Sequence, residues 1–354
     1  MRMKKIMIIA VAAIALAACS KTFDHNKTEG AAIGFGTWTE NLTKARTQGD
    51  NTFTAGDDFA VYGFKLNGST NNVVFDDITV SASGSPLVWD YVTGEVPARY
   101  WDPSATSYTF YGVSPSAIGK AADVDPETGE ISSASITFKG NDNDILVADK
   151  KEVLPAAYGT VVPLVFNHIA SLVDFKVDKD VNLGNAVLAI TSFSITNIDN
   201  TGTFSVNDAY TGTHPVVTWN ATSHAGVYDN TKGVVSVTLP TDVASTVGAE
   251  FLINNLVVMP QTFRTDSNIQ TVNIGYTIKD EANNVSTYTQ SFNLKIFDWG
   301  DDRSQGNNTI IGGWEAGKHY TFILTIDAKK INFSASITPW VKTGNETGYH
   351  YLFN

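Results

Sequence analysis

Cys19 is the residue whose chemistry the sequence specifies most directly, because its surroundings predict that it carries a lipid. It follows a basic start, Met-Arg-Met-Lys-Lys, and an apolar run at residues 6–18. Such a run is short for a membrane span and typical of a signal peptide. Residues 16–19, Leu-Ala-Ala-Cys, match a bacterial lipobox, in which the thiol receives acyl chains such as palmitate. The alternative is an ordinary secretory cut beside an incidental cysteine. We expect a signal peptide at 1–18 and lipid anchoring to the outer membrane.

A second position with possible chemistry is the peptide bond between Arg46 and Thr47. Its neighbours are small or polar, which is typical of an exposed site that proteases reach. The alternative is a surface arginine with no special role, and Lys44 and Arg99 could also be cut. A cut after Arg46 would release residues 19–46 together with the lipid.

The remaining polar residues do not form a recognisable catalytic or metal-binding motif. The histidines show no metal-type spacing, and the Asp- and Asn-rich loops lack the spacing of a calcium hand. No nucleophile motif of the G-x-S-x-G kind is present. The residues considered are His25, His168, His214, His224, His319 and His350, then Asn141, Asp142 and Asp144, then Asp298, Asp301 and Asp302. We expect no catalytic activity, no metal and no cofactor, with His168 a core histidine and the acidic loops ordinary turns.

Aromatic residues offer a different chemistry, the stacking of sugar rings. The tryptophans considered for such a platform are Trp89, Trp101, Trp299, Trp314 and Trp340. Packing in the core or at sheet ends is the alternative, and it is the one we favour.

Composition limits the classes of partner. The chain has 354 residues, 43% of them hydrophobic, and a formal net charge of −12. Because phosphate binding needs Lys and Arg, this acidic balance argues against nucleic acid. With a single cysteine the chain has no disulfide framework, so an exported protein of this kind depends on hydrophobic packing and sheet hydrogen bonds.

Strand patterns follow one another along the chain after residue 30, separated by turn residues such as Asn67-Gly68. The first lies at 31–36, where Ala31, Ile33 and Phe35 alternate with Ala32, Gly34 and Gly36. That period of two gives one apolar face and one nearly bare face. The sequence therefore predicts an all-β fold, with a strand close to the predicted cleavage point. Taken alone, this strand would be a permanent edge strand.

Two segments near the other end of the sequence could pair with a sheet in another copy. In the segment 331–337, Ile331, Phe333, Ala335 and Ile337 alternate with polar residues. In the segment 346–354, Tyr349, Tyr351 and Phe353 share one face. The alternative for 331–337 is an ordinary core strand, in which case 346–354 becomes the better candidate.

Five stretches together resemble the fimbrillin-like family, the type V pilus subunits of Gram-negative bacteria. They are the lipobox, IGFG with KAR-T about ten residues later, GDDFAVYGF, PARYW with SYTFYGVSP, and GGWEAGKHYTFILTI with INFSASITPWV. The resemblance extends over nearly the whole chain after the leader. It implies two transthyretin-like β-sandwich domains in tandem, which we place at 47–165 and 166–354, near Pro163.

The resemblance also implies how the chain is processed. Residues 19–46 would be a propeptide with a removable strand, cut by an arginine-specific surface protease. A strand from the C-terminal region of a neighbouring subunit would then fill the vacated groove. Such head-to-tail contacts repeat into an open filament, and main-chain hydrogen bonds with side-chain pockets would hold each joint.

Two functions from different classes follow as hypotheses. The first is a structural subunit of an adhesive cell-surface fimbrium, with identical or related pilin subunits as partners. The second is a surface-anchored glycan-binding lipoprotein that is never polymerised, and a tip adhesin lies between the two. The sequence names no host or bacterial surface ligand.

Overall fold

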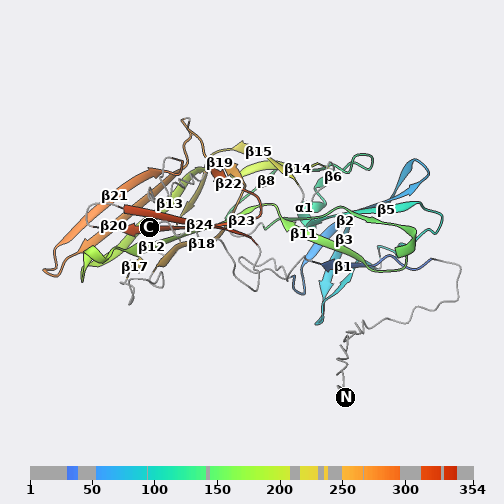
Figure 1. Ribbon diagram of the computed structural model, residues 1–354, viewed down its shortest axis with the longest axis horizontal. Coiled ribbons are helices and arrows are strands. Elements are labelled where there is room, and N and C mark those ends of the chain that lie inside the picture. The colour runs from blue at the N-terminus through green and yellow to red at the C-terminus, as the bar shows by residue number, and fades with distance from the viewer. Residues whose placement is uncertain are drawn as a thin grey trace, which may run out of the picture.

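The computed structural model describes residues 30–38, 53–93, 95–140, 144–207, 216–229, 235–237, 249–265, 267–295, 312–327 and 331–340. Strands dominate these ranges, and this confirms the all-β prediction. The helices are single turns: α1 (Ser116–Gly119), η1 (Pro155–Ala157) and η2 (Val181–Leu183). No helix in the described ranges has the length and apolar character needed to cross a membrane. Figure 1 shows an elongated molecule with the N-terminal strands at one end and β12, β13, β20 and β21 at the other.

Sheet 1 has eight strands and forms most of the N-terminal half. In spatial order it runs β1-β11-β9-β5-β2-β3-β4, and β10 pairs with β5. Its strands are β1 (Phe35–Trp38), β2 (Asp58–Asn67), β3 (Thr70–Ser83), β4 (Val88–Asp90), β5 (Ser107–Ser114), β9 (Leu146–Ala148), β10 (Lys151–Val153) and β11 (Val162–His168). Strand β2 is buried on both faces, which explains its continuous apolar run.

Sheet 2 covers one face of sheet 1. Its order is β15-β14-β7-β6, and β8 pairs with β14. Its strands are β6 (Ala122–Val124), β7 (Ile131–Ser133), β8 (Ile136–Thr137), β14 (Thr201–Val206) and β15 (Val217–Ser223). One core contains Tyr62 and Val113 of sheet 1 together with Ile131 and Phe204 of sheet 2. The other face of sheet 1 surrounds a second core that contains Phe59, Phe110 and Phe166.

Sheets 3 and 4 enclose the third core. Sheet 3 has the order β18-β12-β23-β24, with β12 (Ser171–Lys179), β18 (Glu250–Val258), β23 (Lys318–Ile326) and β24 (Ile331–Pro339). Sheet 4 has the order β16-β13-β20-β21, with β17 paired to β13; these are β13 (Val187–Ile198), β16 (Gly226–Asp229), β17 (Val235–Val237), β20 (Thr271–Lys279) and β21 (Val285–Asn293). A two-stranded sheet pairs β19 (Gln261–Thr262) with β22 (Gly313–Trp314). Phe175 and Phe322 of sheet 3 pack in one core with Ile190 and Tyr276 of sheet 4.

The strand pairing bears on where the chain divides. Strand β11 continues through residues 165 and 166, and β14, which follows residue 200, pairs with β7 and β8 of the N-terminal half. The division into two transthyretin-like domains at 47–165 and 166–354 stays a prediction.

Tyr62 is buried between sheets 1 and 2, and its ionisation should make the free energy of unfolding vary with pH in the alkaline range. Its hydroxyl donates to the carbonyls of Gly119 and Ala122, at 2.8 and 2.9 Å. Burial, with a smaller contribution from nearby carboxylates, raises the pKa of Tyr62 to about 12. An unfolded chain loses this proton near pH 10. Between those values the folded state holds more protons, so the free energy of unfolding should fall as pH rises from about 10 to about 12.

A Tyr62→Phe variant is the test of this dependence. Urea unfolding at several pH values between 9 and 12 should show a shallower fall for the variant than for the wild type. Tyr320, whose pKa burial also raises to about 12, contributes a similar fall that the variant retains. Identical slopes for the two proteins would contradict the assignment to Tyr62.

Candidate functional site

The segment 30–38 closes sheet 1 by pairing on both sides with parts of the chain that are distant in sequence. Ala32 faces Tyr100 in an antiparallel bridge, flanked by hydrogen bonds from Ile33 N to Arg99 O (2.8 Å) and from Trp101 N to Ala31 O (3.0 Å). Beyond this point the segment changes partner. Val162 N donates to Gly34 O at 2.8 Å, and β1 then runs parallel to β11. This change of partner is why the regular strand begins at Phe35 and not at residue 31.

The apolar side chains of this segment are part of the core. Ile33 is 1% exposed and Phe35 is 5% exposed, whereas Ala31, which shares their alternation, is exposed. Phe35 lies edge-on to four aromatic rings, with centroid separations of 5.2 to 6.3 Å; these rings are Phe59, Phe75, Tyr91 and Phe110. Since β1 and β3 lie near opposite ends of the strand order, the contact of Phe35 with Phe75 means that sheet 1 wraps around this core. Figure 1 shows β1 beside β3 and β11.

Three glycines in the segment at residues 30–38 differ in whether their surroundings leave room for a side chain. A Cβ added at Gly30 would lie 2.2 Å from the carbonyl oxygen of Trp101, so only glycine fits there. A Cβ added at Gly34 would meet nothing within 4 Å. A Cβ at Gly36 would come within 3.0 Å of the end of the Val161 side chain, which can move. The backbone at position 30 is therefore the tightest point of the insertion.

Tyr91 ties the segment to its antiparallel neighbour, and sequence reasoning did not find it. Its hydroxyl donates to Ile33 O at 3.0 Å and accepts from Arg99 N at 2.9 Å. Burial raises the pKa of Tyr91, so the hydroxyl keeps the proton that it donates. The Nε of Arg99 donates to Val74 O. The side chain of this alternative cleavage point is therefore held by a hydrogen bond within the fold. Residues 86–91, Pro-Leu-Val-Trp-Asp-Tyr, have the composition of a strand, but nothing in that composition indicates this contact.

A Tyr91→Phe variant should loosen the segment without removing an apolar contact. The change leaves the buried carbonyl of Ile33 without its hydroxyl donor and Arg99 N without its acceptor, which costs about 1–3 kcal/mol. We expect that much loss in the free energy of unfolding and faster proteolysis of the segment at residues 30–38. Tyr100→Phe, at a ring that is 48% exposed, is the matched control and should change little. Equal stability of the two variants would contradict the role of Tyr91.

Removing the segment would leave two sheet edges and an apolar groove. On one side residues 99–101 would lose their partner, and on the other side β11 would become an edge. Pro163 lies where β11 pairs with β1 only, since β9 faces β11 over Phe166 to His168. Edges of this kind associate with other strands unless they are covered. The burial of Ile33 and Phe35 is worth about 1.5–3 kcal/mol each.

The candidate strand at 331–337 forms part of β24, an edge strand of sheet 3. Strand β24 pairs with β23 over nine residues, and its Ala335 is 5% exposed. Ile331 and Ile337 pack against the third core. The strand ends at Pro339 and is followed by Trp340, whose ring stacks on His168 at 4.1 Å between centroids and whose backbone N–H donates to Gly317 O. Within this chain, 331–337 is thus an integral strand.

His168 and Trp340 join the end of β24 to the core between sheets 1 and 2. His168 is 6% exposed, and its Nδ1 lies 2.9 Å from Oδ1 of Asp144. Its Nε2 has no hydrogen-bond partner among the described residues. Trp340 belongs to the same core as Tyr62 and Phe204, although it follows a strand of sheet 3. His168 is thus a core histidine, as expected.

Four of the five tryptophans considered for a sugar-stacking platform lie in the described ranges, and none of these four is exposed. Trp101, Trp314 and Trp340 are each less than 5% exposed, and Trp89 is half-buried against Phe53 and Phe59. Trp299 lies outside the described residues, as do Cys19, Arg46, Thr47, Tyr349, Tyr351, Phe353, Asn141, Asp142 and the loop acids at 298, 301 and 302. Phe333 lies in β24, opposite Leu324 of β23.

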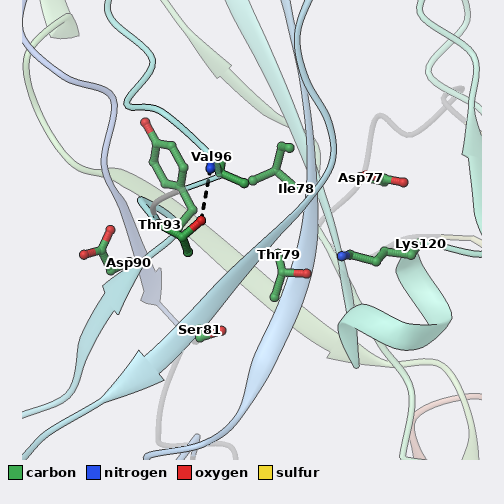
Figure 2. A pocket seen from close by; sticks show the side chains of 9 residues that line it. Asp77, Ile78, Thr79, Ser81, Asp90, Thr93, Val96 and Lys120 are labelled. Atoms are coloured by element: carbon green, nitrogen blue, oxygen red, sulfur yellow. Dashed lines mark hydrogen bonds between the residues drawn. The ribbon is translucent and has the colours of Figure 1, made fainter.

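An open pocket of about 420 Å³ lies beside β3 and β4 (Figure 2). Asp77, Asp90 and Lys120 line it together with hydroxyl side chains, and no histidine or cysteine is among its lining residues. Within the described ranges, no three His, Cys, Asp or Glu side chains form a group that could hold a metal ion. The candidate functional site is therefore the groove that residues 30–38 fill.

Comparison with known proteins identifies the family of this chain. A family model described as fimbrillin-like matches residues 43–340, and the chain belongs to this family. The resemblance inferred from the sequence is therefore confirmed. Membership supports the role of a fimbrial subunit at the cell surface and points away from an enzyme. A search of curated proteins finds no match.

Two solved structures illustrate the likeness. A fimbrial protein from Bacteroides vulgatus is 17% identical, has a TM-score of 0.58, and aligns over 88% of this chain and 99% of its own. The tip fimbrial protein Mfa3 from Porphyromonas gingivalis, with a C-terminal truncation, is 10% identical, has a TM-score of 0.38, and aligns over 84% of this chain and 97% of its own. The first likeness shows a shared fold, and the second is too distant to add to it.

Proposed function

We propose that this chain is a fimbrial subunit whose segment at residues 30–38 occupies the groove between residues 99–101 and β11 until that segment is removed. The chain is exported as a lipoprotein with lipid on Cys19, and an arginine-specific protease cuts it between Arg46 and Thr47. The cut releases residues 19–46, and a strand from a neighbouring subunit fills the groove. The joints repeat head-to-tail into a filament that supports adhesion.

The observation that carries this proposal is the double pairing of the segment. Ile33 and Phe35 are buried in the core. The covalent chain from this segment to the next described residues runs through residues 39–52. The predicted cleavage point, Arg46, lies eight residues after the end of β1. A replacement strand would find main-chain donors and acceptors on both sides and apolar pockets at alternate positions. Arg99 is the less suitable cleavage point, because its side chain and backbone are both hydrogen-bonded.

The donor in this proposal is the segment 346–354 of a neighbouring copy. Strand β24, the rival donor, is paired along its length with β23 and would have to leave its own sheet. The alternative function, a glycan-binding lipoprotein that keeps its segment, receives less support because Trp101, Trp314 and Trp340 are packed in the fold. A tip adhesin would have the groove without supplying a donor.

Cleavage is tested with the purified precursor and an arginine-specific protease. N-terminal sequencing should find Thr47 as the new first residue, while the rest of the chain stays intact. Arg46→Gln is the matched control and should block this cut. A first cut far from Thr47, or loss of the whole fold on cutting, would overturn the proposal.

A further inference from the structure

The groove around residues 30–36 accepts different side chains at successive positions. Position 30 accepts glycine only, because a Cβ there would lie 2.2 Å from the carbonyl oxygen of Trp101. Positions 33 and 35 are buried, and position 35 is enclosed by four aromatic rings. Position 34 is open, since a Cβ there meets nothing within 4 Å. A strand that replaces this one therefore needs glycine, then apolar residues three and five positions later.

Residues 348–354 have this pattern. Gly348 is followed three residues later by Tyr351 and five residues later by Phe353, as Gly30 is followed by Ile33 and Phe35. Leu352 falls at position 34, where an added Cβ meets nothing within 4 Å. We propose that residues 348–354 of a second copy enter the groove in this register, with Gly348 in the place of Gly30 and Phe353 in the place of Phe35. This inference rests on the proposed function and adds the register of the joint.

Other registers fit less well. A second arrangement also puts a glycine at position 30, namely Gly344, but it places the Thr347 hydroxyl where the 1% exposed Ile33 lies. Threonine offers less apolar surface to this buried position than the ring of Tyr351 does. Strand β24 contains no glycine, so it cannot satisfy position 30. Shifting the proposed register by two residues in either direction puts Glu346 or His350 at that position.

The length of chain between Trp340 and Gly348 limits how far apart the donor and acceptor copies can lie. Seven residues, 341–347, lie between Trp340 and Gly348. Fully extended, the eight residue steps from Trp340 to Gly348 reach roughly 28 Å. Trp340 of the donor must therefore lie no farther than this from the position-30 end of the groove in the next copy.

A cysteine pair reports the register directly. Ala32 and Tyr100 face each other as a non-hydrogen-bonded antiparallel pair, an arrangement with Cα atoms about 4.5 Å apart, which suits a disulfide. In the proposed register His350 of the donor takes the place of Ala32. The experiment uses the precursor with Cys19→Ser, Tyr100→Cys and His350→Cys, trimmed with an arginine-specific protease under mild oxidation. We expect disulfide-linked multimers in which peptide mapping joins residue 100 to residue 350.

The matched control carries Glu346→Cys in place of His350→Cys and reports the rival register. Efficient joining of residue 100 to residue 346, with none to residue 350, would overturn the proposal. If trimmed chains without engineered cysteines form no multimers at all, the proposed function fails and the register fails with it. Multimers that form but link through another residue overturn the register alone.

Glycine substitutions give an independent measurement in chains without added cysteines. Gly348→Ala should slow multimer formation of the trimmed chain by tenfold or more, because its Cβ would meet the Trp101 carbonyl of the acceptor. Gly344→Ala should leave the rate unchanged. The reverse result, with Gly344→Ala slow and Gly348→Ala normal, would contradict the proposed register.

Discussion

Replacing Phe35 with alanine should destabilise the precursor by about 3–5 kcal/mol, because the change removes a buried ring and leaves a cavity among four aromatic neighbours. Each edge-on contact adds about 0.5–1.5 kcal/mol beyond the burial of area. Denaturant unfolding of the precursor measures the loss. Since the weakened segment would leave the groove more often, we also expect faster cleavage at Arg46.

Two comparisons give this prediction its specificity. Gly34→Ala, one position away, adds a methyl group into open space and should change stability by less than about 0.5 kcal/mol. Once residues 19–46 are removed, Phe35→Ala and wild-type chains are identical, so their multimers should have the same stability. A precursor that tolerates Phe35→Ala without loss, or multimers that differ, would contradict the role assigned to the segment.

The second large effect is expected at Trp340. Its ring is 4% exposed and stacks on His168, and it fixes the point from which residues 341–354 continue. Trp340→Ala should cost about 3–5 kcal/mol through the cavity that it leaves. It would also release the end of β24 from the core between sheets 1 and 2. Unfolding of the precursor measures the first effect, and hydrogen exchange of the amides in β24 measures the second.

The control for Trp340 is a change that keeps an aromatic ring. Trp340→Phe retains stacking on His168 and should cost less than half as much as the alanine variant. Equal losses in the two variants would mean that the stacking is not what stabilises this junction. Wild-type exchange rates in β24 of the alanine variant would mean that Trp340 does not secure the strand.

The sequence patterns predicted which face of a strand is buried but not which strands lie next to it. The alternation at 31–36 predicted which side chains turn inward, and Ile33 and Phe35 are indeed buried. It could not predict that the segment pairs first with residues 99–101 and then with β11. A period of two defines the face of a strand, whereas its neighbours depend on contacts between residues far apart in sequence.

The same limit applies to the arrangement of the sheets. A boundary near Pro163 followed from the rule that proline disfavours a central strand. In the structure Pro163 is accommodated within β11, at the end that faces β1 alone. The pairing of β14 with β7 and β8 joins segments about 70 residues apart, and no local pattern marks it. The contact of Tyr91 with Ile33 is equally non-local, because one hydroxyl among many tyrosines carries no signal in the sequence.

The most direct measurement of the central claim is the mass of the subunit inside purified multimers. The precursor is treated with an arginine-specific protease, multimers are separated from monomers by size, and their subunits are weighed by mass spectrometry. The account predicts subunits that begin at Thr47, with no peptide from residues 19–46 retained. Multimers built from uncut chains, or trimmed chains that stay monomeric with the 19–46 peptide still bound, would contradict it.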